Sequence, residues 1–148
     1  MIGNNIDQEI KNAMLAKDQA RLRGLRAIKA AFLLAKTEKG STDEISEEGE
    51  LKILQKLVKQ RRESADIYKQ QGREDLSAIE EEEIAVISDF MPSQLDAEAV
   101  RKVISRLIET SGASSMKDMG RIMGLANMEL AGKADGKLIA EIVKQELA

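Results

Sequence analysis

The residues best suited to contact a ligand lie in the last third of the chain, where two glycines stand among basic side chains. Lys117 and Arg121 are four residues apart, so they share one face of a helix. Gly120 and Gly124 are one turn apart, and each glycine weakens a helix interior by about 0.5–1 kcal/mol relative to alanine. This pattern indicates a close approach by another backbone, and it leaves open either tight helix packing or contact with a ligand.

A second basic segment follows at Gly132–Gly136 and includes Lys133. Lys137 comes next, where a helix is expected to begin, and the free amides and macrodipole of a helix N-terminus favour a phosphate. Asp135 argues against this idea, because a capping carboxylate would already occupy those amides. The segment also lacks the GxxxxGK[ST] pattern of a nucleotide-triphosphate loop.

Two opposite charges interrupt apolar stripes in the middle of the chain. Arg61 lies within the stripe of one predicted helix, and Glu83 lies within the stripe of the next. Long helices joined by a short turn pack antiparallel, and a lone buried charge is costly. We therefore expect Arg61 to pair with Glu83 or with nearby Glu80 inside the bundle, as a contact that specifies packing.

The residue types that most catalytic sites need are missing. The 148 residues include no His and no Cys, which removes imidazole bases, thiolate nucleophiles and sulfur-bound zinc. Carboxylates and lysines could still catalyse, but the acidic run Glu80–Glu83 spreads around a helix and is typical of a solvated face. We expect no catalytic residue, no metal and no cofactor.

Composition and periodicity predict an all-α fold. The chain is 43% hydrophobic and 33% charged with a single Pro, which is rich in helix formers and too apolar for disorder. Apolar residues recur at helical spacing in seven segments, and no alternating strand pattern competes. The expected helices run from about Ile6 to Ala16, from an Asp18 cap to Gly40–Asp43, from Ser46 to Gln70 with Gly72 as C-cap, from Glu74 to Met91, from an Asp96 cap to Gly112, from a Ser115–Asp118 capping box to Gly132, and onward from an Asp135 cap.

Pro92 marks the expected boundary between two parts, because proline lacks an amide hydrogen and restricts the residue before it. Residues 1–92 form an N-terminal four-helix part, and residues 93–148 form a small three-helix module. The net charge is −3 overall, with the acidity concentrated in residues 40–92. This balance argues against indiscriminate binding of nucleic acid.

The motifs of both parts closely resemble those of the GatB/YqeY family. In the second part the resemblance rests on Lys117–Gly124 and Gly132–Gly136. In the first part it rests on Lys59-Gln60-Arg61, Glu63-Ser64, Tyr68, Gly72-Arg73, Asp75-Leu76, Phe90-Met91-Pro92 and Gln94-Leu95. The length is similar to that of the stand-alone YqeY-like proteins. One departure is Asn127-Met128-Glu129, where the family commonly has Met-Pro-Lys, and it bears on where the sixth helix ends.

What the resemblance implies is a helical bundle followed by a three-helix module, and an association with RNA. In glutamine-dependent tRNA amidotransferases the GatB tail helps to hold the tRNA, while transamidation takes place in other domains. Any carbon–nitrogen ligase activity would therefore belong to that large enzyme, and the resemblance implies no activity for the stand-alone proteins.

Two functions of different classes remain open. The first is binding of tRNA, or of a tRNA-charging complex, through Lys117, Arg121, Lys133 and Lys137, with Gly120 and Gly124 allowing close approach. The second is a protein adaptor that docks on an amidotransferase or synthetase, using the basic residues Arg21, Arg23, Arg26 and Lys29. The alternative to both functions is that these basic residues are ordinary solvent-exposed charges with no binding role.

The N-terminus carries no basic stretch followed by an apolar run, and no window reaches the 18 or more apolar residues of a membrane span. We therefore expect a cytoplasmic protein with no membrane contact.

Overall fold

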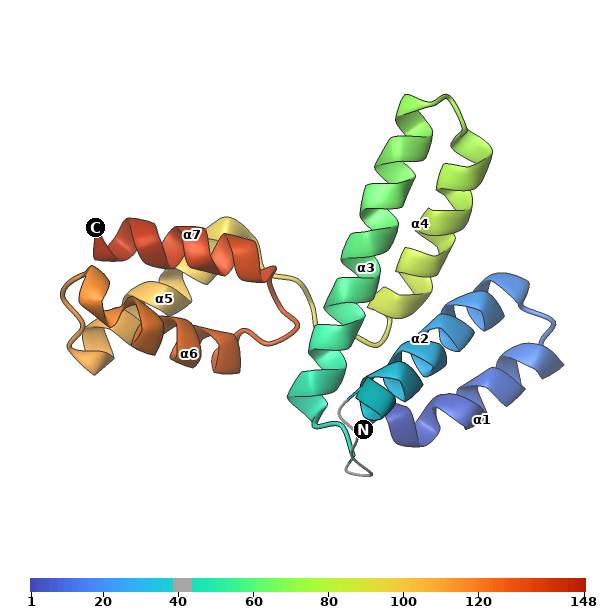
Figure 1. Cartoon of the computed structure of the whole chain (residues 1–148), viewed down its shortest axis with the longest axis horizontal. Coiled ribbons are helices and arrows are strands. Elements are labelled where there is room, and N and C mark those ends of the chain that lie inside the picture. The colour runs from blue at the N-terminus through green and yellow to red at the C-terminus, as the bar shows by residue number, and fades with distance from the viewer. Residues whose placement is uncertain (39–43) are drawn as a thin grey trace. The chain divides into compact units, whose positions relative to one another are not determined.

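The computed structural model describes residues 1–38 and 44–148, and this part of the chain confirms the all-α prediction: it is helical with no strand. Figure 1 shows the helices in order along the chain. They are α1 (Ile2–Leu15), α2 (Gln19–Glu38), α3 (Glu47–Gln70), α4 (Glu74–Ser88), α5 (Ala97–Ser111), the short 3-10 helix η1 (Met116–Asp118), α6 (Met119–Glu129) and α7 (Gly136–Leu147). The chain divides into two compact units, Met1–Met91 and Pro92–Ala148.

The first unit is built on the antiparallel pair α3 and α4; α2 packs against α4, and α1 packs mainly against α2 (Figure 1). Its core is aliphatic, with one buried ring, and consists mainly of Ile6, Leu22, Leu25, Ile28, Phe32, Leu54 and Ile87. Gly24 is required where α2 meets α4, because a Cβ there would lie 2.6 Å from Cγ1 of Val86. The expected end of the second helix, Gly40–Asp43, lies outside the described residues.

Helix α1 begins four residues earlier than expected, at Ile2 in place of Ile6. The cause is a residue far away in sequence: Glu50, on α3, accepts hydrogen bonds from the backbone amides of Ile2 (3.0 Å) and Gly3 (2.8 Å). The first amides of a helix have no partner within the helix. The Glu50 carboxylate supplies one, so α1 can start where no local capping residue predicts it.

Helix α4 ends three residues before the expected Met91. Beyond Ser88 the chain continues in tighter turns, in which each amide bonds the carbonyl three residues back: Asp89 to Val86, Phe90 to Ile87 and Met91 to Ser88. This tightening agrees with the restriction that Pro92 imposes on the residue before it.

The second unit is a three-helix module in which α5, α6 and α7 contact one another. Its boundaries follow local signals: Asp96 accepts from the Ala99 amide at 2.8 Å, and Gly112 ends α5 in the left-handed region (φ 74°). The expected capping box at the sixth helix forms only in part: the Ser115 hydroxyl accepts from the Lys117 amide and caps η1, while Asp118 accepts from the Ser114 amide and α6 begins at Met119 without a side-chain cap. The core comprises Val100, Ile104, Leu107, Ile122, Ala126, Leu130, Ile139, Ile142, Val143 and Leu147.

Two apolar residues face solvent although each follows the apolar spacing of its helix. Leu33 is 54% exposed although its neighbour Phe32 is buried, and Ile79 is 42% exposed on α4. Helical spacing alone assigns them to the core, but the neighbouring helices do not cover these positions. No helix of the described part is long and apolar enough to cross a membrane.

Candidate nucleic-acid interface

The outer side of η1 and α6 gathers four of the residues that the sequence singled out. They follow the i, i+3, i+4, i+7 spacing of one helix face and are all exposed, together with two apolar side chains further along. We call this set the α6 face: Lys117, Gly120, Arg121, Gly124, Leu125 and Met128.

Neither glycine of the α6 face is needed for packing within this chain. A Cβ placed on Gly120 or Gly124 would meet nothing within 4 Å among the described residues. Tight helix packing, one of the two alternatives that the sequence left open, is therefore not the reason for these glycines in the described structure. What remains is a strip of bare helical backbone, bordered by basic side chains, that an incoming molecule could approach closely.

The two cations of the α6 face differ in their pairing. Arg121 Nη2 lies 3.1 Å from Asp118 Oδ1, while the described residues include no ion-pair partner for Lys117. A hydrogen bond from the Ser114 amide lowers the pKa of Asp118, with smaller contributions from the Ser115 amide and from Arg121. Asp118 therefore stays ionised at neutral pH and offsets part of the Arg121 charge.

The other two predicted cations lie at the turn between α6 and α7. Lys133 follows Gly132, which has a φ of 74°, and Lys137 lies in the first turn of α7, where its amide donates to Asp135 at 3.3 Å. The Asp135 cap is confirmed, and it occupies the amide that a phosphate would need. Neither lysine side chain has a described ion-pair partner.

The four cations do not converge on a single point. Lys117 and Lys133 lie beyond opposite ends of α6, whose 11 residues span about 16 Å at 1.5 Å per residue. A small anion could not bridge that distance, whereas an extended polyanion could contact both ends.

The expected ion pair between Arg61 and Glu83 is present in the first unit, and Arg23 also approaches Glu83. Arg61 Nε lies 2.8 Å from Glu83 Oε2, and the two side chains are 19% and 17% exposed. Arg23, on α2, brings its Nε to 3.8 Å from the other Glu83 oxygen and its Nη2 to 2.6 Å from Glu82. Glu83 thus links α2, α3 and α4, while Glu80 is half-buried and makes no described ion pair with Arg61.

Most of the basic residues of α2 that were proposed as an adaptor surface form ion pairs within the first unit. Arg21 contacts Glu9 (3.1 Å) and Asp89 (3.4 Å), and Lys29 contacts Asp7 (2.6 Å). Together with the pairing of Arg23, these contacts leave exposed Arg26 as the member of the set without a described ion pair. Helix α2 therefore offers a partner fewer unpaired positive charges than its sequence suggests.

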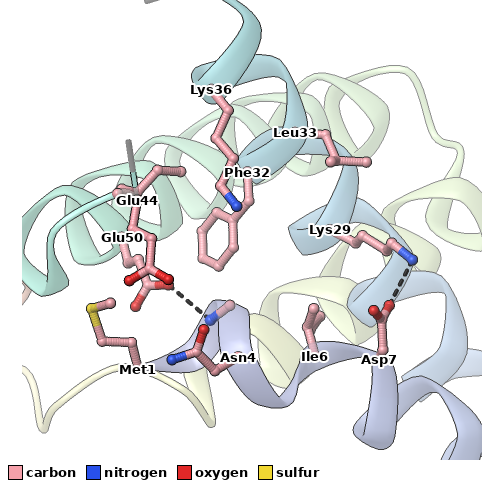
Figure 2. Close-up of a pocket in the computed structure, with 12 residues that line it drawn as sticks. Met1, Asn4, Ile6, Asp7, Lys29, Phe32, Leu33, Lys36, Glu44 and Glu50 are labelled. Atoms are coloured by element: carbon pink, nitrogen blue, oxygen red, sulfur yellow. Dashed lines mark hydrogen bonds and ion pairs between the residues drawn. The ribbon is translucent and has the colours of Figure 1, made fainter. Parts of the chain in front are cut away.

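A pocket of about 150 Å³ lies in the first unit near the start of α1, and Lys29 is one of its lining residues. Figure 2 shows the Glu50 carboxylate pointing at the first turn of α1, with Phe32 forming part of the wall and Lys29 paired to Asp7. Glu50 is 3% exposed, and its oxygens are engaged by the two amides that they cap. In this pocket the Glu50 carboxylate caps α1 and Lys29 pairs with Asp7, so these polar groups stabilise the fold.

Sequence reasoning missed the positioning roles of three residues. Glu50 precedes Leu54 by four positions, so its place on the buried face of α3 could have been read from the helical spacing. The roles of Arg23 and Gln94 had no such signal, because their partners are 59 and 38 residues away. The described residues include no cluster of carboxylates that could hold a metal ion.

Curated relatives are similar to this chain over most of its length. The chain is 29% identical over 131 residues to Altered inheritance of mitochondria protein 41, mitochondrial, of Clavispora lusitaniae, a match to 86% of this chain and 75% of that protein. It is 30% identical over 123 residues to the protein of the same name from Vanderwaltozyma polyspora, covering 77% and 64%. For Meyerozyma guilliermondii the values are 27% over 127 residues, covering 82% and 66%. The chain thus spans about two thirds of the length of the last two relatives.

The expectation of a cytoplasmic protein is wrong, because these relatives are named as mitochondrial proteins. It relied on the lack of an export signal and of a membrane span. Neither feature distinguishes the cytosol from the interior of an organelle.

The family comparison covers nearly the whole chain. The family model described as Yqey-like protein matches residues 3–147, which include nearly all of both units and every residue of the α6 face. The chain therefore belongs to the YqeY-like protein family.

Proposed function

We propose that this protein is an accessory tRNA-binding protein without catalytic chemistry of its own, and that it contacts RNA through the α6 face and the adjoining turn. The observation that carries the proposal is the pair of glycines on that face. They weaken α6, nothing within the described chain comes close to them, and Lys117 and Arg121 lie beside them. Because packing within the described chain does not explain why these glycines are present, contact with another molecule is the favoured explanation.

The chemistry of the second unit favours contact with the RNA backbone. Lys117, Lys133 and Lys137 have no described ion-pair partner, and they are spread over the length of α6. The three aromatic residues of the chain all lie before Pro92, so the second unit has no ring on which a base could stack. Binding through phosphates and the shape of a folded RNA fits such a surface.

The family resemblance supports the same proposal. The run from Lys117 to Gly124 resembles the signature of the GatB tail, which helps to hold tRNA in an amidotransferase complex. By analogy with the names of the relatives, the proposal includes a mitochondrial setting. Any ligase activity would come from a partner enzyme.

The test is a filter-binding salt series with unfractionated tRNA. The site variant carries Lys117→Ala, Arg121→Ala, Lys133→Ala and Lys137→Ala. If the three unpaired lysines each neutralise a phosphate, the dependence of log K on log salt should become shallower by about three units. Affinity at low salt should fall with it.

A matched variant controls for the loss of four positive charges. Lys11→Ala, Lys56→Ala, Lys59→Ala and Arg62→Ala remove three lysines and one arginine from exposed positions of the first unit. This variant should bind like wild type. A site variant with the affinity and salt slope of wild type, or a control variant with the same loss, contradicts the proposal.

A protein adaptor is the second candidate, and one observation favours it. Leu125 and Met128, on the α6 face, are 37% and 72% exposed, so this face could also dock on a partner by apolar contact. A pulldown after RNase treatment separates the two functions. An amidotransferase or synthetase retained after RNase supports the adaptor, whereas its loss together with the RNA supports tRNA binding.

A further inference from the structure

The turn between α6 and α7 is held from a distance by the segment that opens the second unit. Gln94 Nε2 donates to the carbonyl of Gly132 at 2.6 Å, and the backbone amide of Leu95 donates to the carbonyl of Lys133 at 2.8 Å. Two successive carbonyls of the turn are therefore fixed by two successive residues located 38 positions earlier in the chain.

Other described features also define the shape of this turn. Gly132 has a φ of 74°, which favours glycine, and the Lys133 amide donates to the Leu130 carbonyl at 2.9 Å. Leu130 and Ala134 are buried on either side, so the segment between them is anchored at both ends. Gly132 lies three residues beyond the end of α6, and the side-chain amide of Gln94 supplies a donor for its carbonyl.

The carboxamide of Gln94 is used fully as a donor. Besides the Gly132 carbonyl, Nε2 reaches the Pro92 carbonyl at 3.3 Å, so its two hydrogens bridge the start of the unit and the turn. Leu95 packs its side chain against the core of the same unit, and Asp96 then caps α5. Gln94 therefore lies on a rigid support.

We infer that Gln94 is a positioning residue, which sets the backbone of the Gly132–Lys133 turn so that Lys133 faces an extended polyanion. The inference rests on the proposed function and assigns a role to a residue outside the α6 face. Gln94 itself need not touch RNA. Its effect on binding should pass through Lys133.

A double-mutant cycle tests this route. Gln94→Met keeps the length of the side chain and removes both donors, and it is combined with Lys133→Ala. Binding of unfractionated tRNA is measured over a salt series for wild type, both single variants and the double variant. Gln94→Met should weaken binding by no more than Lys133→Ala does, and it should make the salt slope shallower by up to about one unit. In the Lys133→Ala background it should have no further effect.

Hydrogen exchange gives a second readout that does not need RNA. In Gln94→Met the amides of Leu95 and Lys133 should exchange faster, because the turn has lost a support. Gln60→Met, which removes a carboxamide from an exposed position of α3, should change neither exchange nor binding. If Gln94→Met does not fold, Gln94→Asn, which keeps the donors and draws them back by one methylene, takes its place.

The outcomes separate the inference from the function on which it rests. Wild type that binds no tRNA overturns both. Wild type that binds, with Gln94→Met and Lys133→Ala contributing additively or with an unchanged salt slope for Gln94→Met, overturns the positioning role alone. Unchanged exchange at Leu95 and Lys133 in Gln94→Met also overturns it.

Discussion

Replacement of Glu83 should destabilise the first unit more than replacement of either arginine that contacts it. Glu83 is the only carboxylate that both Arg61 and Arg23 approach among the described residues, at 2.8 and 3.8 Å. Glu83→Leu would leave two guanidinium groups near each other, one of them with a buried Nε that has no described hydrogen-bond partner. Arg61→Met would leave Glu83 still close to Arg23.

The exposed fractions set the expected magnitudes. Removing one partner of a fully buried pair costs about 3–5 kcal/mol, and an exposed pair is worth about 0–1 kcal/mol. Arg61 and Glu83 are 19% and 17% exposed, which puts their pair nearer the buried case. We expect losses of about 2–3 kcal/mol for Glu83→Leu and about 1–2 kcal/mol for Arg61→Met, with a coupling free energy of about 1 kcal/mol in the double variant.

Urea unfolding can follow the first unit by itself. The chain has one Tyr and no Trp, and Tyr68 lies on α3, so its fluorescence reports on the helices that the ion pair joins. Lys69 and Glu81 provide the control, because they link the same two helices at 2.6 Å with side chains that are 53% and 52% exposed. A cycle of Lys69→Met and Glu81→Leu should give a coupling close to zero.

Two results would refute this reasoning. Additive losses for Arg61→Met and Glu83→Leu would mean that the short distance between the two groups contributes nothing to stability. Equal coupling in the exposed pair Lys69–Glu81 would mean that burial does not set the strength of these contacts.

Three further predictions concern single side chains, each measured as a change in the free energy of unfolding. Glu50→Gln should cost about 2 kcal/mol and speed hydrogen exchange at the start of α1, because the amide group cannot accept from both backbone amides; unchanged exchange contradicts the cap. Ser77→Ala should stabilise the first unit by about 1 kcal/mol, since the hydroxyl is buried with no described partner, and a loss of stability would reveal a missed hydrogen bond. Gly24→Ala should cost about 1–3 kcal/mol through its clash with Val86, whereas Gly124→Ala, in open space, should stabilise the second unit by about 0.5–1 kcal/mol in thermal unfolding followed by circular dichroism; similar effects at both positions would contradict the packing that separates them.

Local signals made much of the fold predictable from sequence. Ser46 and Asp96 accept hydrogen bonds from amides three residues on, and Gly112 ends its helix with a positive φ, as the chemistry of each residue suggests. These features depend on the conformation of a few neighbouring residues. The family resemblance likewise rested on short runs of sequence.

Long-range contacts account for what the sequence did not predict. The start of α1 depends on Glu50, 47 or more positions away, and the α6–α7 turn depends on Gln94. Helical spacing also assigned Leu33 to the core, although whether a neighbour covers an apolar face depends on tertiary packing. At the candidate site the sequence identified the two glycines. Only the structure could show whether another part of the chain packs against them.

The contact between Gly24 and Val86 limits how this fold can vary. A Cβ on residue 24 would lie 2.6 Å from Cγ1 and 2.7 Å from Cβ of Val86, so the two positions share a fixed volume between α2 and α4. A larger residue at one position can be accommodated only by a smaller residue at the other or by a wider separation of the helices. Where relatives carry Ala or Ser in place of Gly24, their equivalent of Val86 should be reduced in size, and the two positions should change together.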